Sequence, residues 1–152
     1  MTDLVGTCPK DFWLEWIAEG DAAGTVETGD EYTWRTRDPR ARLIGPGDRF
    51  YIVAWGLLRG YAPVTRVAGL DDGYGAFAIC RKGGAVAVTL ARPIPGFRGL
   101  RERWWRREDE LPFVDWRTAG VAVGGRGGIS APNGTEFRPG GGILPLFDGK
   151  DR

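Results

Sequence analysis

The chain of 152 residues contains no histidine and only two cysteines, Cys8 and Cys80. Without histidine, the Ser–His and Cys–His nucleophile arrangements and the usual general base near neutral pH are excluded. The two cysteines have no CxxC spacing, so the pattern of a structural zinc site is missing as well. Any catalysis would have to rest on carboxylate, lysine or tyrosine, and we expect neither a metal nor a cofactor.

Long hydrophobic runs are also missing. No stretch approaches the ~18 consecutive apolar residues that span a bilayer, and the first residues do not form a cationic segment followed by an apolar run. A chain of this size is typical of one domain, which buries roughly two thirds of the surface that the unfolded chain exposes. We expect a cytoplasmic protein without a membrane partner.

Lysine is scarce, because only Lys10, Lys82 and Lys150 accompany the arginines among 21 basic residues. The net charge of +1 hides an uneven distribution: residues 1–34 carry eight acidic and one basic side chain, whereas residues 35–107 carry fifteen basic and five acidic. Arginine suits bidentate phosphate contacts and stacking on bases. The basic block at 35–107 therefore favours an anionic ligand such as DNA or RNA. The alternative interpretation is that these arginines simply form a solvated basic face.

Short β signals recur along the chain, and glycine- and proline-containing turns separate them. Strands are predicted at about 11–18, 49–55, 60–68, 74–82 and 85–93, with a turn at "IGPGD" (44–48) and a hairpin at "KGG" (82–84). We interpret residues 96–116 as a strand or irregular segment rather than a helix. The pattern indicates a mainly β protein with short helices, in a sandwich or barrel.

The composition changes near residue 118. Residues 120–142 include nine glycines and almost no large apolar side chains, which is too little to pack a core. We therefore predict a β domain over residues 1–118 and a glycine-rich tail over 119–152. The apolar segment "ILPLF" (143–147) could dock the tail on the domain.

Three segments resemble the PUA-like superfamily, in its EVE and ASCH branches: "FWLEW" (12–16), "YTWRTRDPRARLIGPGDRFYIVAWG" (32–56) and "LRGYAPVTRV" (58–67). The matching positions, in the order of the EVE pattern, are Trp34, Arg42, Gly47, Asp48, Tyr51 and Gly60. Farther along, "GFRGLRER" (96–103) is similar to the ASCH pattern GxKxxExR, with Arg98 in place of its lysine and Arg101 in place of its glutamate. The resemblance covers about residues 10–95.

This resemblance implies a small, curved PUA-like β-barrel whose pocket receives one nucleobase, often a modified one, flipped out of a strand. The aromatic candidates for the pocket are Trp13, Trp34, Trp55, Tyr61 and Trp116. The candidates for phosphate contacts are Arg35, Arg37, Arg42 and Arg59. Rings replace the stacking that a flipped base loses, and guanidinium groups hold the flanking phosphates.

Each candidate also has a structural interpretation. A tryptophan in a barrel is often part of the core, Tyr61 could simply pack, and Asp48 is typical of a turn rather than of a catalytic acid. "RWWRRED" (103–109) could be an accessory strip for nucleic acid, or a strand with one face paired to Glu108, Asp109 and Glu110.

Two other function classes stay open. An ASCH-like hydrolase or nuclease would use Lys10 with Glu15, or Glu15 with Asp48. A non-catalytic protein-interaction module would bind a partner through its glycine-rich tail.

Overall fold

The computed structural model describes residues 2–8, 25–71 and 73–114. Ten short elements follow one another in this part: β1 (Leu4–Thr7), β2 (Tyr32–Thr36), η1 (Pro39–Leu43), β3 (Arg49–Ala54), β4 (Leu57–Gly69), β5 (Phe77–Arg81), β6 (Val88–Thr89), β7 (Leu100–Glu102), η2 (Arg107–Asp109) and β8 (Leu111–Pro112). The two η elements are 3₁₀ helices. Trp13, Trp116, the strand predicted at 11–18 and the tail at 119–152 lie outside the described residues.

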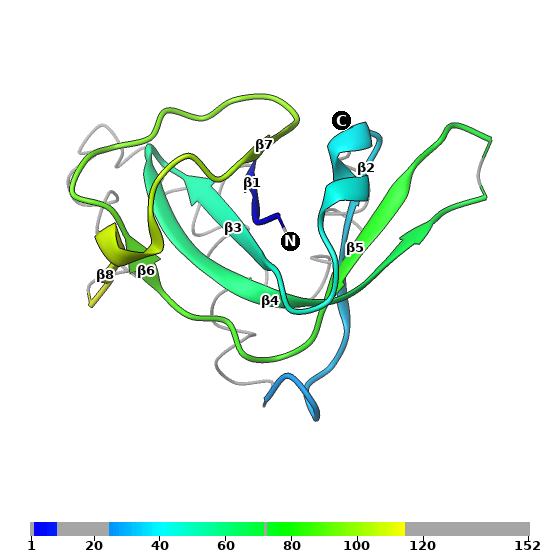
Figure 1. Cartoon of the computed structure of the whole chain (residues 1–152), viewed down its shortest axis with the longest axis horizontal. Helices are drawn as coiled ribbons and strands as arrows, with labels where there is room; N and C mark the ends of the chain where they lie inside the picture. The colour runs from blue at the N-terminus through cyan, green and yellow to red at the C-terminus, as the bar shows by residue number, and fades with distance from the viewer. Residues whose placement is uncertain (1, 9–24, 72, 115–152) are drawn as a thin grey trace, which may run out of the picture.

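Six strands form one curled sheet in the order β2-β5-β4-β3-β1-β7, and β6 and β8 form a second, two-stranded sheet (Figure 1). Within the large sheet, β1 runs parallel to β3, whereas the other neighbours are antiparallel. The protein is therefore mainly β with short helical turns, as the sequence predicts, and its sheet has the curvature of a half-barrel.

The 13-residue strand β4 causes this curl, because it belongs to both halves of the sheet. Its first half pairs with β3 as far as Pro63, and its second half pairs with β5 from Val64 onward. Register shifts interrupt both pairings, and the first shift leaves Arg59 as an extra residue between Leu58 and Gly60. A bulge of this kind bends a strand and increases its twist.

The strands predicted at 49–55 and 60–68 are present as β3 and β4, which pair as an antiparallel hairpin. Trp55 and Gly56 connect the strands with positive φ angles of 52° and 76°, which is the conformation of a two-residue turn whose twist matches the strands. Tryptophan rarely adopts such a φ because its Cβ crowds the backbone. The turn therefore holds the Trp55 ring against the core at the end of the sheet.

The predicted "GPGD" turn is also present, and it explains Asp48. This side chain is 2% exposed, and its Oδ2 accepts hydrogen bonds from the backbone N–H groups of Gly45 (2.9 Å) and Thr2 (3.2 Å). Gly47 supplies the positive φ of 91° that the turn needs. Asp48 thus ties the turn to the segment before β1.

One predicted hairpin is wrong. "KGG" (82–84) does not join two paired strands, since β5 pairs with β2 and β4. After it the chain crosses to the other half of the sheet, where Val86 exchanges two backbone hydrogen bonds with Tyr61 (2.8 and 2.9 Å) and β6 pairs with β8. The strand predicted at 85–93 is thus reduced to this bridge and the two residues of β6.

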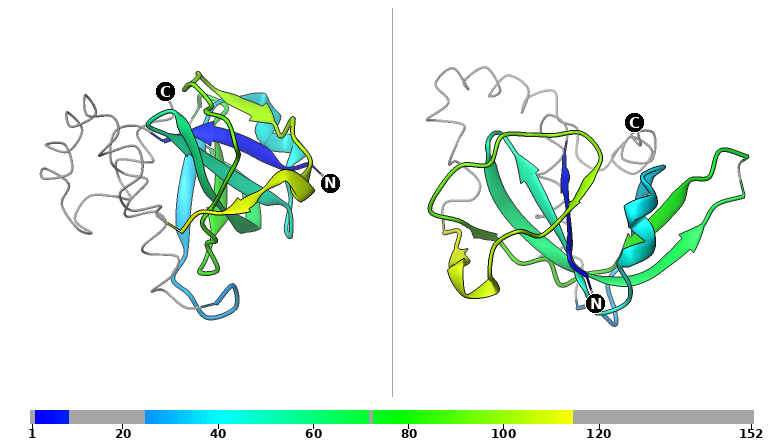
Figure 2. Two further views of the ribbon diagram at one scale, coloured as in Figure 1. Left: turned by 90° about the vertical axis from the view of Figure 1, so that its left-hand side faces the viewer. Right: turned by 45° about the horizontal axis from the view of Figure 1, so that its top comes forward.

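Both faces of the central strands are buried. On β3, Phe50 and Ile52 face the larger core cluster, whereas Tyr51 and Val53 face a smaller one. Side chains alternate between the two faces of a strand, so this division follows from the period of two. The smaller cluster includes Ile94 and Trp105, which come from the segment that arches over the sheet between β6 and η2 (Figure 2).

Candidate functional site

A cleft of about 460 Å³ opens above the smaller core cluster. Its wall on the β6–β7 loop is Leu90, Arg92, Pro93, Ile94, Pro95 and Gly96, and its other residues are Arg101, Trp104 and Trp105. Pockets that hold small organic ligands usually measure about 300–1,000 Å³. The volume is therefore sufficient for a planar heterocycle with part of its sugar and phosphate.

Three aromatic rings shape this end of the molecule. The ring of Trp104 lies edge-on to Trp105, with centroids 5.0 Å apart and planes at 84°, and it also lies edge-on to Phe97 at 6.1 Å. Trp105 is 8% exposed, whereas Trp104 is 50% exposed. Trp105 therefore belongs to the floor, and Trp104 offers ring surface to a ligand.

The buried carboxylate of Glu110 fixes the floor. It accepts hydrogen bonds from the Trp105 indole (2.8 Å), the Tyr51 hydroxyl (2.6 Å) and the Arg49 guanidinium (3.1 Å). Burial, together with the hydrogen bond to Glu110, raises the pKa of Tyr51 well above its ordinary value. Tyr51 thus stays a neutral donor, and Trp105 is held in one orientation.

A second buried carboxylate, Asp3, holds the chain that follows the cleft. It accepts hydrogen bonds from Arg103 Nε (2.9 Å), Arg107 Nη2 (2.9 Å) and the backbone N–H of Arg49 (2.8 Å). Burial alone would raise the pKa of Asp3, but these donors outweigh it and lower the pKa below 3.8. Arg103 also donates to the Trp105 carbonyl, which links this carboxylate to the cleft.

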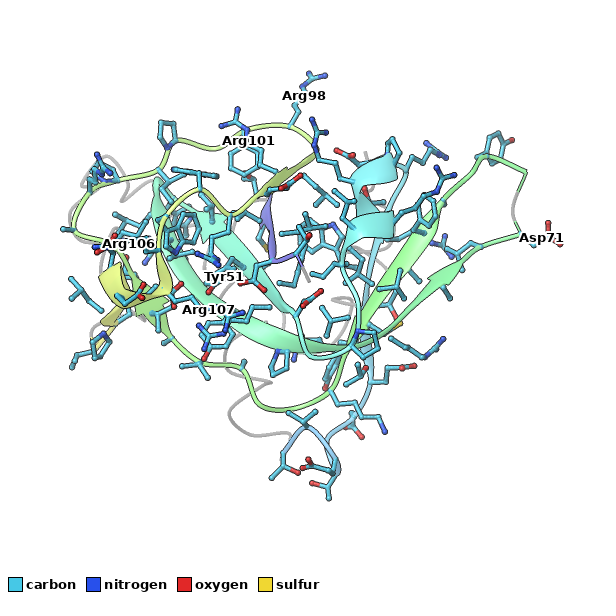
Figure 3. The ribbon with its side chains drawn as sticks, viewed as in Figure 1. Tyr51, Asp71, Arg98, Arg101, Arg106 and Arg107 are labelled. Atoms are coloured by element: carbon cyan, nitrogen blue, oxygen red, sulfur yellow. The ribbon has the colours of Figure 1, made fainter. Side chains whose placement is uncertain are left out.

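Two exposed arginines, Arg92 and Arg101, line the cleft, and the exposed Arg98 lies on the same loop. Within residues 2–8, 25–71 and 73–114, no ion pair involves Arg92, Arg98 or Arg101. Arg101 lies over the Phe97 ring at 4.2 Å, which orients the guanidinium but leaves its N–H edge available. Figure 3 shows Arg98, just before β7, and Arg101, on β7, directed outward.

The predicted aromatic residues lie elsewhere. Trp34 packs against the larger core, with its ring 5.0 Å from Phe50, and the hollow beside it measures only about 10 Å³. Such a space is comparable to one water molecule and is too small for a base. Tyr61 is half-buried against Tyr51, and the Arg49 guanidinium covers its ring at 4.1 Å.

Arg59 is fully buried, unlike a surface arginine that meets phosphate. Its Nε donates to the Ala54 carbonyl (2.9 Å), and its guanidinium lies between the rings of Trp55 (5.7 Å) and Phe113 (5.3 Å). Burial lowers the pKa of Arg59 to about 10. In this structure Arg59 braces the β3–β4 turn from inside, and Trp55 packs on the same core.

The remaining predicted phosphate ligands lie on β2, on η1 and on the short connection between them. Arg37 and Arg42 are exposed, and their guanidinium groups lie over the rings of Tyr74 (5.1 Å) and Phe77 (5.3 Å). Arg35 is half-buried on β2. The structure therefore separates the predicted set, since two arginines share an exposed surface with aromatic rings whereas Trp34, Trp55 and Arg59 pack inside.

The proposed catalytic pairs are not assembled in the described residues. Asp48 is used by its turn, and Lys10 and Glu15 lie outside them. Within the same part of the chain, no group of three or more Asp, Glu, Cys or His side chains could hold a metal ion. Neither of the two 3₁₀ helices there has the length or the apolar character of a membrane-spanning helix.

Comparison with protein families, curated proteins and solved structures finds no match to this chain. The candidate site is therefore defined by geometry alone. Arg92, Arg101 and Trp104, which line the cleft, are absent from the predicted pocket. An accessory strip for nucleic acid was, however, one of the two interpretations of "RWWRRED" (103–109), which contains Trp104. The adjacent tryptophans after an arginine-rich loop were the available signal.

Proposed function

We propose that this protein is a nucleic-acid-binding module that receives one unpaired base in the cleft beside Trp104. The observation that carries the proposal is a 460 Å³ cleft that combines a half-exposed indole with two arginines, Arg92 and Arg101, that form no ion pair with any residue the structure describes. The base lies on the Trp104 ring, and Arg92, Arg98 and Arg101 contact the flanking phosphates. A preference for a modified base, as the PUA-like resemblance implies, is part of this proposal.

The physical reasons are general ones. A base that leaves its stack needs another π-face, and stacking on an aromatic side chain contributes about 1–3 kcal/mol. Guanidinium groups bind phosphate oxygens in pairs and release counterions, so such binding weakens as salt rises. Trp105 and Glu110 keep the floor rigid, which lowers the entropic cost of ordering the site.

The first experiment is a titration of the full chain with fluorescein-labelled eight-nucleotide single strands, as DNA and RNA, plain or with one 5-methylcytosine. We expect binding at low salt, and a Trp104→Ala variant that binds about 5- to 150-fold more weakly, as the loss of one stacked base predicts. The matched control is Leu111→Ala, which removes another exposed apolar side chain.

Arg101→Ala should weaken binding and reduce its salt dependence, whereas Arg66→Ala should do neither, because Arg66 is paired with Glu31 (2.8 Å) away from the cleft. Absence of binding to every strand at low salt would remove the proposal. Equal affinity of the Trp104→Ala variant would remove the cleft from it.

A further inference from the structure

Beyond the cleft, strand β7 and the loop before it lie next to η1. The backbone N–H of Leu100 donates to Asp38 Oδ2 (2.8 Å), and Asp38 also caps η1 by accepting from the backbone N–H of Arg40 (2.9 Å). Gly99 packs so closely here that an added Cβ would lie 2.6 Å from the same Asp38 oxygen. The segment that carries Arg98 and Arg101 is therefore held to Asp38, the residue that caps η1.

The surface beyond this junction has the same chemistry as the cleft. Arg37 and Arg42 are exposed, and each guanidinium lies over an aromatic ring. Tyr74, under Arg37, is 71% exposed near the end of the β4–β5 hairpin. The acidic group at the junction, Asp38, is 11% exposed and already holds Arg40. It therefore opposes an incoming phosphate less than a free carboxylate would.

We infer that the cleft and the η1 surface form one track for a single strand of nucleic acid, with Arg98 next to the junction and Arg37 and Arg42 beyond it. This inference rests on the proposed function of the cleft. The partner is a single strand because its bases can reach exposed rings, whereas the bases of a duplex are stacked inside. Sites on small β-barrels that bind single strands cover about 4–16 nucleotides, so the ligand must exceed a dinucleotide.

Five arginines line this track, and their number sets a measurable salt dependence. Each phosphate contact to a single strand changes the slope of log K against log salt by about −0.7. Three contacts in the cleft give a slope of about −2, and two more at Arg37 and Arg42 give about −3.5. Affinity should thus rise with strand length until the strand reaches η1.

The test compares strands of two, four, eight and twelve thymidines with the wild-type chain and with an Arg37→Ala/Arg42→Ala double variant. We expect the double variant to bind the dinucleotide as the wild type does. For the twelve-nucleotide strand, we expect its salt slope to fall from about −3.5 to about −2. Lys82→Ala is the control for loss of a basic side chain on another part of the sheet.

The outcomes separate the two proposals. The dinucleotide could bind through Trp104 while longer strands gain no affinity and bind the double variant as tightly as the wild type. That result would support the cleft and refute the track. If no strand binds, the proposed function fails first. A double-stranded oligonucleotide that binds as tightly as the single strand would also contradict the track. Circular dichroism of the double variant checks that its fold is intact.

Discussion

The cleft and the η1 surface both combine arginine with aromatic rings, but they differ in what lies beneath the rings. Below the cleft, Trp105 is anchored by the buried carboxylate of Glu110, and a second tryptophan, Trp104, stands half-exposed above it. On the η1 side, Trp34 is packed against Phe50 in the core, and guanidinium groups lie over the exposed Tyr74 ring and the half-buried Phe77 ring.

This difference shows why an aromatic residue beside arginines does not by itself make a base pocket. A ring contributes to binding only when one face stays open and its support is rigid. At Trp104 a half-exposed ring and a rigid support occur together next to a void of sufficient volume, and the Arg101 guanidinium lies 6.0 Å from the ring centroid. Trp34 packs in the core, so a ligand on this side would meet the arginines of the η1 surface and the exposed Tyr74 ring.

The largest effect is expected for Glu110→Ala, which removes the carboxylate that holds the floor of the cleft in place. The change leaves Arg49, the Tyr51 hydroxyl and the Trp105 indole without their common acceptor, and loss of one member of a buried charged network costs about 3–5 kcal/mol. Urea unfolding followed by circular dichroism measures it. Glu108→Ala, on the exposed side of η2, should change stability by less than about 0.5 kcal/mol. Equal, small effects of both changes would show that the floor does not depend on this carboxylate.

A smaller effect distinguishes the two tryptophans directly. Trp34→Ala should reduce the free energy of unfolding by about 3 kcal/mol, because it opens a cavity beside Phe50 in the core. Trp104→Ala should cost less than about 1 kcal/mol but should lose affinity for single strands. Paired denaturation and binding measurements on the two variants test the comparison. The reverse pattern would make Trp34 the ligand-binding ring.

The smallest effect concerns acid. Since the folded pKa of Asp3 is below 3.8, its contribution to stability is present above that pH and is lost as the pH falls through the folded pKa. Asp3→Asn should therefore flatten the decline in stability below about pH 4. Asp109→Asn, at an exposed pair with Arg106, should leave this decline as it is. Urea unfolding at several pH values between 2 and 7 makes the measurement, and an unchanged profile for Asp3→Asn would contradict the assignment.

The β3–β4 hairpin could be predicted from the sequence because it depends on local signals. Apolar residues alternate with the period of a strand, "GPGD" starts the first strand, and Trp55–Gly56 permits the tight turn. "KGG" offered an equally good local signal and was misleading. In the segment that follows, Val86 instead forms its backbone hydrogen bonds with Tyr61, more than twenty positions earlier in the chain. No local pattern encodes such a partner.

The candidate site shows the same limit. The arginine-rich block and the paired tryptophans of "RWWRRED" are visible in the sequence, and these residue types suit phosphate contacts and base stacking. The burial of Trp105 rather than Trp104 depends on the segment that covers the face of β3 carrying Tyr51 and Val53. It also depends on the carboxylates of Asp3 and Glu110, which come from opposite ends of the described chain. Alternation predicts two faces for Tyr51 and its neighbours, but it cannot tell which face adjoins a void.

The position of β1 has a consequence for how the molecule is made. Its neighbours in the sheet are β3 and β7, and the register joins Leu4 to Phe50 on one side and to Glu102 on the other. Synthesis proceeds at about 5–20 residues per second. The edge of β1 that pairs with β7 therefore stays unpaired for roughly 5–20 s until β7 has been synthesised. Pairings between such distant segments also slow folding in solution. The antiparallel strands from β2 to β5 can associate earlier, and closure by β7 is then the late step that assembles the wall carrying Arg101.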